Sequence, residues 1–153
     1  MIRSTVDDWH RVLRGELPGG LDALLADDVV FFSPIVFSPQ RGKALTAMYL
    51  NAAFSVFLGG PPGHAGGAPF PTGGGSGSFR YVNEILDGNH AALEFETELD
   101  GKHVNGVDLI TCNDEGRIVE FKVMIRPLQA VNVLHERMRT MLEAAPGPAG
   151  GGA

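Results

Sequence analysis

The dipeptide Asp100-Gly101 constrains the fold of this chain more than any other feature, because it lies between two runs of alternating apolar and polar residues, 90–99 and 102–112. Aspartate followed by glycine is a preferred sequence for a two-residue type I′ turn, which fixes the register of the two strands that it joins. That antiparallel register places Leu93 directly across from Asp108. It also pairs Leu99 with Lys102, Thr97 with Val104, and Phe95 with Gly106.

A second hairpin is predicted immediately after the first. The four-residue loop Asn-Asp-Glu-Gly joins the second strand to a third strand at residues 117–126. A loop of this length pairs Cys112 with Arg117, and therefore Asp108 with Phe121.

These registers assign each side chain to one face of the sheet, because side chains alternate along a strand. One face is apolar except for the carboxyl group of Asp108, and otherwise holds Leu93, Phe95, Thr97, Val104, Gly106, Ile110, Val119, Phe121, Val123 and Ile125. The other face is mixed and holds Glu94, Glu96, Glu98, His103, Asn105, Val107, Leu109, Ile118, Glu120, Lys122, Met124 and Arg126. The mixed face either contacts solvent or forms a homodimer contact.

Helical patterns come before and after these strands. Apolar spacing predicts a helix at residues 5–14 capped by Ser4 or Thr5, a short helix around 21–25, and a third helix with apolar residues from 45 to 57. Strands are expected at 29–32, ending before Pro34, and at 79–86. The last helix begins after Pro127 and directs Leu128, Val131, Leu134, Met138 and Met141 toward the core. This order predicts an α+β fold, a cone-shaped curved antiparallel sheet wrapped around three N-terminal helices, with a C-terminal helix.

Two segments are poor in residues that could enter a core. Residues 59–78 and the C-terminal tail 144–153 are rich in glycine and proline, so ordering them is costly in entropy. We expect one domain over residues 1–143, with 59–78 as a flexible insertion and 144–153 as a disordered tail.

Composition excludes several classes of partner. The formal net charge is −6 and no basic stripe is present, which argues against nucleic acid. The N-terminus lacks the apolar core of a signal peptide, and no apolar run is long enough to span a bilayer. The single cysteine and the spacing of the five histidines do not suggest a metal site. We therefore expect a cytoplasmic protein with no metal, no cofactor and no membrane association.

Two stretches of the sequence resemble the nuclear transport factor two-like superfamily, which includes ketosteroid isomerases, limonene epoxide hydrolase and SnoaL-like polyketide cyclases. The first is LDALLADDVVFFSP followed by RGKALTAMY, similar to the family's short helix, first strand and third helix. The second is VNGVDLITCNDEGRIVEFKV, similar to its closing pair of strands. The resemblance implies the cone-shaped fold and a pocket, but no single reaction.

The resemblance also places three catalytic positions of ketosteroid isomerases on this chain. The late aspartate corresponds to Asp108, the tyrosine of the first helix to Trp9, and the aspartate that moves the proton to Ser33. Serine is no base near neutral pH without a partner, so the usual route of steroid isomerisation is not expected. The acid that cyclases and the epoxide hydrolase carry on the last strand is missing near Val123 and Met124.

Asp108 is the candidate catalytic residue, because a carboxyl group on an apolar face loses hydration and its pKa should rise. The predicted ligand-binding residues are Trp9, Ser33, Leu93, Phe95, Val104, Ile110, Phe121, Val123 and Ile125. The residues leave open whether the chain is an isomerase, cyclase or hydrolase acting on an apolar polyketide-, terpenoid- or steroid-like compound with Asp108 as acid or oxyanion partner. The alternatives are a non-catalytic binding module and a dimeric interaction domain.

Overall fold

A computed structural model describes residues 1–58 and 79–144 of the chain. The predicted insertion at 59–78 and nearly all of the predicted tail at 144–153 lie outside the described residues. Within the described part, no helix is both long and apolar enough to cross a membrane.

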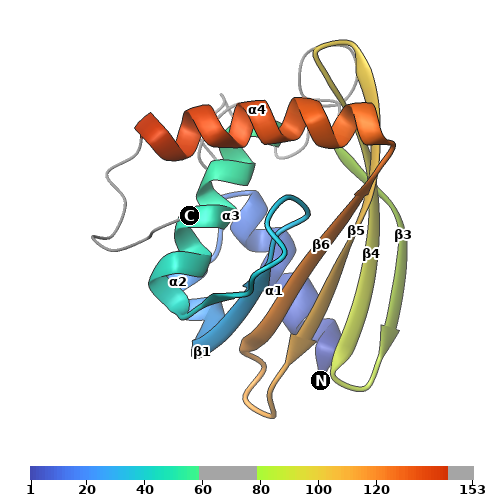
Figure 1. Ribbon diagram of the computed structural model, residues 1–153. Helices are drawn as coiled ribbons and strands as arrows, with labels where there is room; N and C mark the ends of the chain where they lie inside the picture. The colour runs from blue at the N-terminus through green and yellow to red at the C-terminus, as the bar shows by residue number, and fades with distance from the viewer. Residues whose placement is uncertain (59–78, 145–153) are drawn as a thin grey trace.

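One curved six-stranded sheet forms the body of the protein, and the long helices lie on its concave side (Figure 1). The elements along the chain are α1 (Ile2–Leu13), α2 (Gly20–Leu24), β1 (Leu25–Phe32), β2 (Gln40–Arg41), α3 (Lys43–Leu58), β3 (Arg80–Asp87), β4 (His90–Leu99), β5 (Lys102–Cys112), β6 (Ile118–Arg126) and α4 (Leu128–Ala144). The strand order is β2-β1-β6-β5-β4-β3, with β1 parallel to β6 and the other pairs antiparallel. The α+β class predicted from the sequence is confirmed.

The first predicted hairpin is confirmed in its boundaries and its register. Strands β4 and β5 begin and end at the expected residues, and Leu93 lies opposite Asp108. At the turn, Asp100 and Gly101 both have positive φ, as a type I′ turn requires. Local turn chemistry was therefore sufficient to set this part of the sheet.

The predicted register of the second hairpin is wrong. Asp108 lies opposite Val123, and a bulge separates the pair formed by Cys112 and Ile118 from the rest of the ladder. The physical reason lies in the loop, where the side chain of Asn113 accepts hydrogen bonds from two backbone amides. The net shift is two residues along most of the strand, so Phe121 and Val123 still face the concave side.

The bulge also exchanges two residues between faces. Ile118, expected on the mixed face, is fully buried, and Val119, expected inside, is only partly buried. A turn-based register cannot foresee this, because one extra residue in a strand inverts the alternation beyond it.

Two details of the helices also differ from the sequence-based expectation. Helix α1 begins at Ile2, and Thr5, expected as its cap, is buried and donates to the carbonyl oxygen of Gly116. In α4, Leu128 is 74% exposed, while Ala130 and Leu134 are buried. The core-facing stripe of α4 therefore starts two residues later than predicted.

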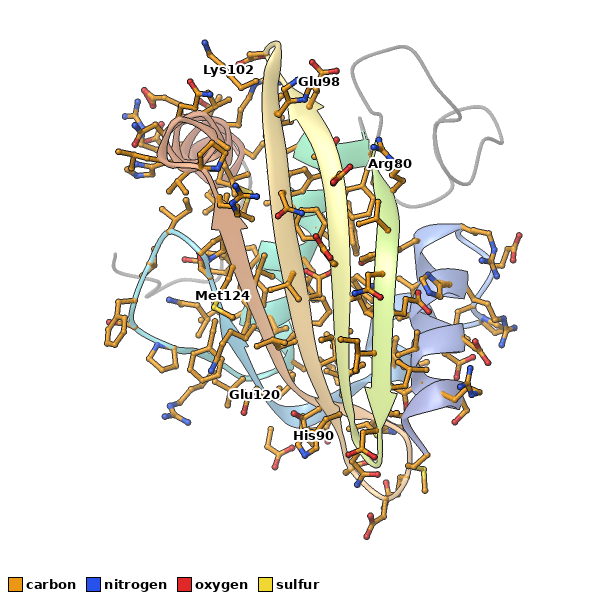
Figure 2. All side chains as sticks on the ribbon, turned by 90° about the vertical axis from the view of Figure 1, so that its right-hand side faces the viewer. Arg80, His90, Glu98, Lys102, Glu120 and Met124 are labelled. Carbon is orange, nitrogen blue, oxygen red and sulfur yellow. The ribbon has the colours of Figure 1, made fainter. Side chains whose placement is uncertain are left out.

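The convex face of the sheet is left uncovered by helices (Figures 1 and 2). Figure 2 shows Arg80, Glu98 and Met124 on this side. We call it the outer face and the concave side the inner face.

Candidate functional site

Asp108 lies in the middle of β5 on the inner face, between Leu93 of β4 and Val123 of β6. Its side chain is only 5% exposed, and both cross-strand neighbours are apolar. A carboxyl group in such surroundings must be neutralised or hydrogen-bonded. The sequence-based expectation that Asp108 points inward agrees with this placement.

A chain of two hydrogen bonds meets the carboxyl group of Asp108. The indole Nε1 of Trp9 on α1 donates to the Oη of Tyr81 on β3 over 2.9 Å. Tyr81 Oη in turn donates to Asp108 Oδ2 over 2.6 Å. Side chains from α1 and β5, which are distant in sequence, thus meet at Tyr81 Oη on β3.

The position of Tyr81 follows from strand alternation along β3. Phe79 and Tyr81 are two residues apart, and Tyr81 pairs with Phe95, whose side chain is buried on the inner face. A second contact, between His10 Nε2 and Glu84 Oε1 at 2.6 Å, joins α1 to the same strand. The edge strand is therefore attached to α1 at two points.

Burial raises the pKa of Asp108 to about 7, and the hydrogen bond from Tyr81 offsets part of that rise. The pKa of Tyr81 is raised well above its usual value, first by burial and then by the adjacent Asp108 carboxylate. At neutral pH the phenol keeps its proton, while the carboxyl group exists in both protonation states. Asp108 is therefore able to give or take a proton near pH 7.

The carboxyl group borders a cavity of about 60 Å³ between the inner face and helices α1, α3 and α4. Its described walls are aromatic and aliphatic, and their polar side chains are those of Trp9, Ser33, Tyr81 and Asp108. A predominantly apolar cleft with a few convergent polar groups is the usual form of a small-molecule site.

The structure brings together five of the nine ligand-binding residues predicted from the sequence. The cavity wall includes Trp9, Ser33, Phe95, Phe121 and Val123. The other four, Leu93, Val104, Ile110 and Ile125, face inward but are absent from that wall. Side-chain alternation gives the face of the sheet, while the covering helices decide which part of that face stays open.

Trp9 lines the cavity and also holds Tyr81 in position through a hydrogen bond. Its ring packs against Phe121, with ring centroids 4.9 Å apart, and against Phe54 at 5.7 Å. Because the indole N–H donates to Tyr81, it is already engaged within the protein. Trp9 therefore fixes the tyrosine rather than offering a free donor to a ligand.

The oxygen atom of Ser33 is used by the turn that follows β1. Ser33 Oγ accepts from the backbone amides of Ile35 at 3.0 Å and Val36 at 3.3 Å. Serine side chains commonly close turns in this way. Because this oxygen already accepts two hydrogen bonds, it is poorly suited to act as a base.

Tyr81 is the functional residue that sequence reasoning missed. The available signal was its spacing of two from Phe79 within a predicted strand, which places both side chains on one face. Its contacts with Trp9 and Asp108 span 72 and 27 residues of sequence, so no local pattern reveals them.

Within residues 1–58 and 79–144, no group of three or more histidine, cysteine or acidic side chains is arranged to hold a metal ion. The single cysteine, Cys112, is buried in the core.

Comparison with solved structures finds proteins whose folds align with almost the entire chain. A steroid delta-isomerase from Pseudomonas aeruginosa is 30% identical, with a TM-score of 0.76, covering 94% of this chain and 92% of that one. An uncharacterised bacterial protein with a cystatin-like fold, from Silicibacter pomeroyi, is 28% identical with a TM-score of 0.73, covering 92% and 86%. An NTF2-like protein of unknown function from Mesorhizobium loti shares the fold at 18% identity, with a TM-score of 0.60 over 82% of this chain and 91% of that one. No protein-family model and no curated protein matches the sequence.

Proposed function

The chain belongs to the nuclear transport factor two-like superfamily, and on that premise we propose that it is an enzyme acting on a small apolar carbonyl compound. Asp108 is its acid and hydrogen-bonds the carbonyl oxygen of the substrate. The observation that carries the proposal is the buried Asp108 carboxyl group, held by Tyr81 at the edge of an apolar cavity.

The chemistry of Asp108 suits a reaction that builds negative charge on oxygen. A neutral carboxyl group donates a short hydrogen bond to an enolate or alkoxide, and burial strengthens that bond. Since the pKa of Asp108 is about 7, a sizeable fraction is protonated at neutral pH. The reaction classes that fit are isomerisation, cyclisation and hydration of apolar carbonyl compounds, in which Asp108 stabilises the charge on oxygen and a water molecule takes up the proton that leaves carbon, because the described wall of the cavity holds no separate base.

The character of the cavity supports an apolar substrate. Apart from Asp108, the described wall has no carboxylate and no lysine, arginine or histidine. Charged substrates would lose hydration there without gaining a counter-ion. The relative named as a steroid delta-isomerase supports a hydrocarbon-rich carbonyl compound as the first class to assay.

The test is turnover of a β,γ-unsaturated ketone, first a one-ring cyclohexenone and then a Δ5-3-ketosteroid, followed by the absorbance of the conjugated product. We expect Asp108→Asn to lower kcat/KM roughly 100-fold or more, the usual contribution of a general acid. Asp87→Asn is the matched control, because Asp87 is an exposed aspartate at the end of β3. An unchanged rate in Asp108→Asn would remove the proposed mechanism.

A second candidate is a binding module that holds its ligand without turnover. It is favoured by the wall of the cavity, where Asp108 and Tyr81 are the only ionisable side chains among the described residues. No described side chain of this wall thus supplies a separate base. A ligand retained in a native mass spectrum, with a thermal shift but no product, would support this reading over the enzyme.

We also propose that the outer face forms a homodimer. A groove there is lined by residues that include Ile85, Val107 and Met124, and the side chains of Ile85 and Met124 are 61% and 48% exposed. Exposed apolar side chains grouped on a bare sheet face are typical of an interface between subunits.

Sedimentation velocity tests the dimer. We expect Met124→Lys to convert a dimer to a monomer at micromolar concentration, because it would bury a charge in the interface. Leu128→Lys is the matched control, since Leu128 is an exposed apolar residue on α4. A monomeric wild-type protein would contradict the proposal.

A further inference from the structure

We propose that Met138 of α4 sets the size of the ligand: the cavity takes a single flat ring when the side chain of Met138 moves aside, and it excludes fused-ring skeletons. This inference rests on the small-molecule site of the proposed function. It adds to that function the size class of the ligand and the residue that determines it.

The cavity beside Asp108 is small, with a volume of about 60 Å³. For comparison, a dry apolar cavity of about 150 Å³ in a protein holds one molecule of benzene. One ring therefore enters this site only if a side chain of the wall gives way. A skeleton of several fused rings requires several side chains to do so.

One part of the wall is a group of packed rings that resists displacement. Phe57 of α3, Phe79 and Phe95 of β4 are at most 8% exposed, and their ring centroids lie 5.0–5.9 Å apart. Tyr81 packs against Phe79 at 5.2 Å and is held by its hydrogen bond to Asp108. Movement of one of these rings would break its contacts with the others, because the core is densely packed.

A second group of rings belongs to a separate cluster of the core. Trp9 packs against Phe54 and Phe121, and Phe121 packs against Phe31 of β1 at 6.1 Å. These four side chains are at most 4% exposed. Both groups of rings line the cavity, so an occupant completes the core between them. A flat ring suits such walls, because aromatic rings pack well by their faces and edges.

Met138 differs from these rings in its flexibility and in its place on α4, the helix that lies across α3 (Figure 1). Ala130, Leu134 and Met138 follow one another at intervals of four residues and are 0%, 2% and 8% exposed, so they form the buried stripe of the helix. Met141 beyond them is only partly buried, so this stripe ends at Met138.

Met138 also has the only long unbranched side chain in the described wall of the cavity. Methionine has three rotatable bonds and adapts to irregular space better than branched or aromatic residues. Met138 is therefore the wall residue that can turn outward without moving the rest of the core.

The experiment measures the binding of toluene and naphthalene, hydrocarbons with one ring and two fused rings, by calorimetric titration of the full chain into each. Neither has a carbonyl group, so their affinities report the size of the site and not the acid chemistry of Asp108. We expect the wild-type chain to bind toluene with a Kd at least roughly tenfold lower than that of naphthalene, although naphthalene has more apolar surface to bury. Equal or tighter binding of naphthalene, or no binding of toluene, would overturn the inference.

Met138→Ala should reverse this preference, because the shortened side chain leaves room for a second ring. The Kd of naphthalene should fall at least roughly tenfold, as expected when an apolar pocket gains room for one or more methylene groups. Met141→Ala is the matched control, since the same substitution three residues later on α4 falls outside the described wall of the cavity. It should leave both Kd values unchanged, and unchanged naphthalene binding in a folded Met138→Ala chain would contradict the role of Met138.

Met138→Phe tests the movement of the side chain, and it decides the question with the wild-type titrations if Met138→Ala does not fold. A ring of similar size turns aside less easily than the methionine chain, so toluene should bind roughly tenfold more weakly. Toluene binding as tight as in the wild-type chain would show that no displacement of residue 138 is needed, and would overturn the inference.

These outcomes are separable from those of the proposed enzymatic activity. Size-selective binding of toluene without turnover of any β,γ-unsaturated ketone would leave the size limit in place and contradict the proposed function. Turnover of the Δ5-3-ketosteroid by the wild-type chain, lost in Asp108→Asn, would support the proposed function and overturn the size limit.

Discussion

The two faces of the hairpin formed by β4 and β5 place acidic side chains in opposite surroundings. On the inner face, Leu93 and Phe95 are almost fully buried around the single carboxyl group of Asp108. On the outer face, Glu96 pairs with Arg80 over 2.7 Å and Glu94 accepts from Asn105 over 3.0 Å. Figure 2 shows the outer face with Arg80 and Glu98 directed away from the body of the protein.

The difference between the faces comes from hydration. An outer carboxylate keeps its water and gains little from a partner, whereas an inner one loses water and depends on Tyr81 or a proton. The direction of a carboxyl side chain in this sheet therefore decides how much of its hydration it keeps.

The largest effect expected from this difference between the faces is on the free energy of unfolding as the pH rises to neutrality. The pKa of Asp108 is raised from 3.8 to about 7 in the folded chain. Between these pH values the folded chain therefore keeps a proton that the unfolded chain has released. Stability should therefore fall as pH rises from about 4 to about 7, by up to about 4 kcal/mol. Asp108→Asn removes this loss and should be the more stable protein at pH 8, as measured by urea unfolding at pH 5 and 8.

An exposed aspartate serves as the control for that measurement. Asp87→Asn should leave the difference in unfolding free energy between pH 5 and 8 unchanged. If Asp108→Asn and the wild-type chain lose stability equally between these pH values, the inner face does not carry a buried titrating carboxyl group. A gain in stability together with a loss of turnover would be typical of a functional residue.

A smaller effect is expected from crowding of the inner face at Gly106, which lies two residues before Asp108 on β5. A Cβ atom there would contact the ring of Phe95 and lie 2.8 Å from Ile125 Cγ2 and 2.9 Å from the backbone oxygen of Met124. Overpacking of this kind usually costs about 1–3 kcal/mol. Gly106→Ala should lower the midpoint of urea unfolding accordingly.

The control for Gly106→Ala is the next residue on the same strand. Val107→Ala alters the groove of the outer face and should change the unfolding free energy by less than about 1 kcal/mol. Equal losses in the two variants would mean that the faces do not differ in packing.

The smallest effect is expected from the outer ion pair. The side chains of Arg80 and Glu96 are 59% and 44% exposed, so solvent screens their attraction. Arg80→Ala should cost less than about 1 kcal/mol at low salt and almost nothing at high salt, measured by thermal unfolding. A loss that persists in high salt would show that Arg80 supports the sheet in another way.

The parts of the fold that were predicted correctly depend on local chemistry. The Asp100-Gly101 turn set the β4–β5 register, and with it the position of Asp108 opposite Leu93. The next register failed because the side chain of Asn113 reorganised the loop and a bulge followed. A turn is predictable when its dipeptide fixes φ and ψ, and less so when a side chain competes for the backbone amides.

The candidate site was only half predictable for a related reason. Asp108 was identified because one acid on an apolar strand face is visible in the alternation of residues. Tyr81 was not, because its partners come from α1 and β5 and meet it only after the edge strand has paired.

The sequence by itself determined the α+β class, the first hairpin and the inward direction of Asp108, since each follows from neighbouring residues and a period of two. The tertiary structure alone decided that Trp9, Tyr81 and Asp108 form one hydrogen-bonded chain, and that the cavity opens beside it. The physical reason is that the pKa of a buried group depends on desolvation and on partners brought from distant segments, and neither is encoded in the residues next to it.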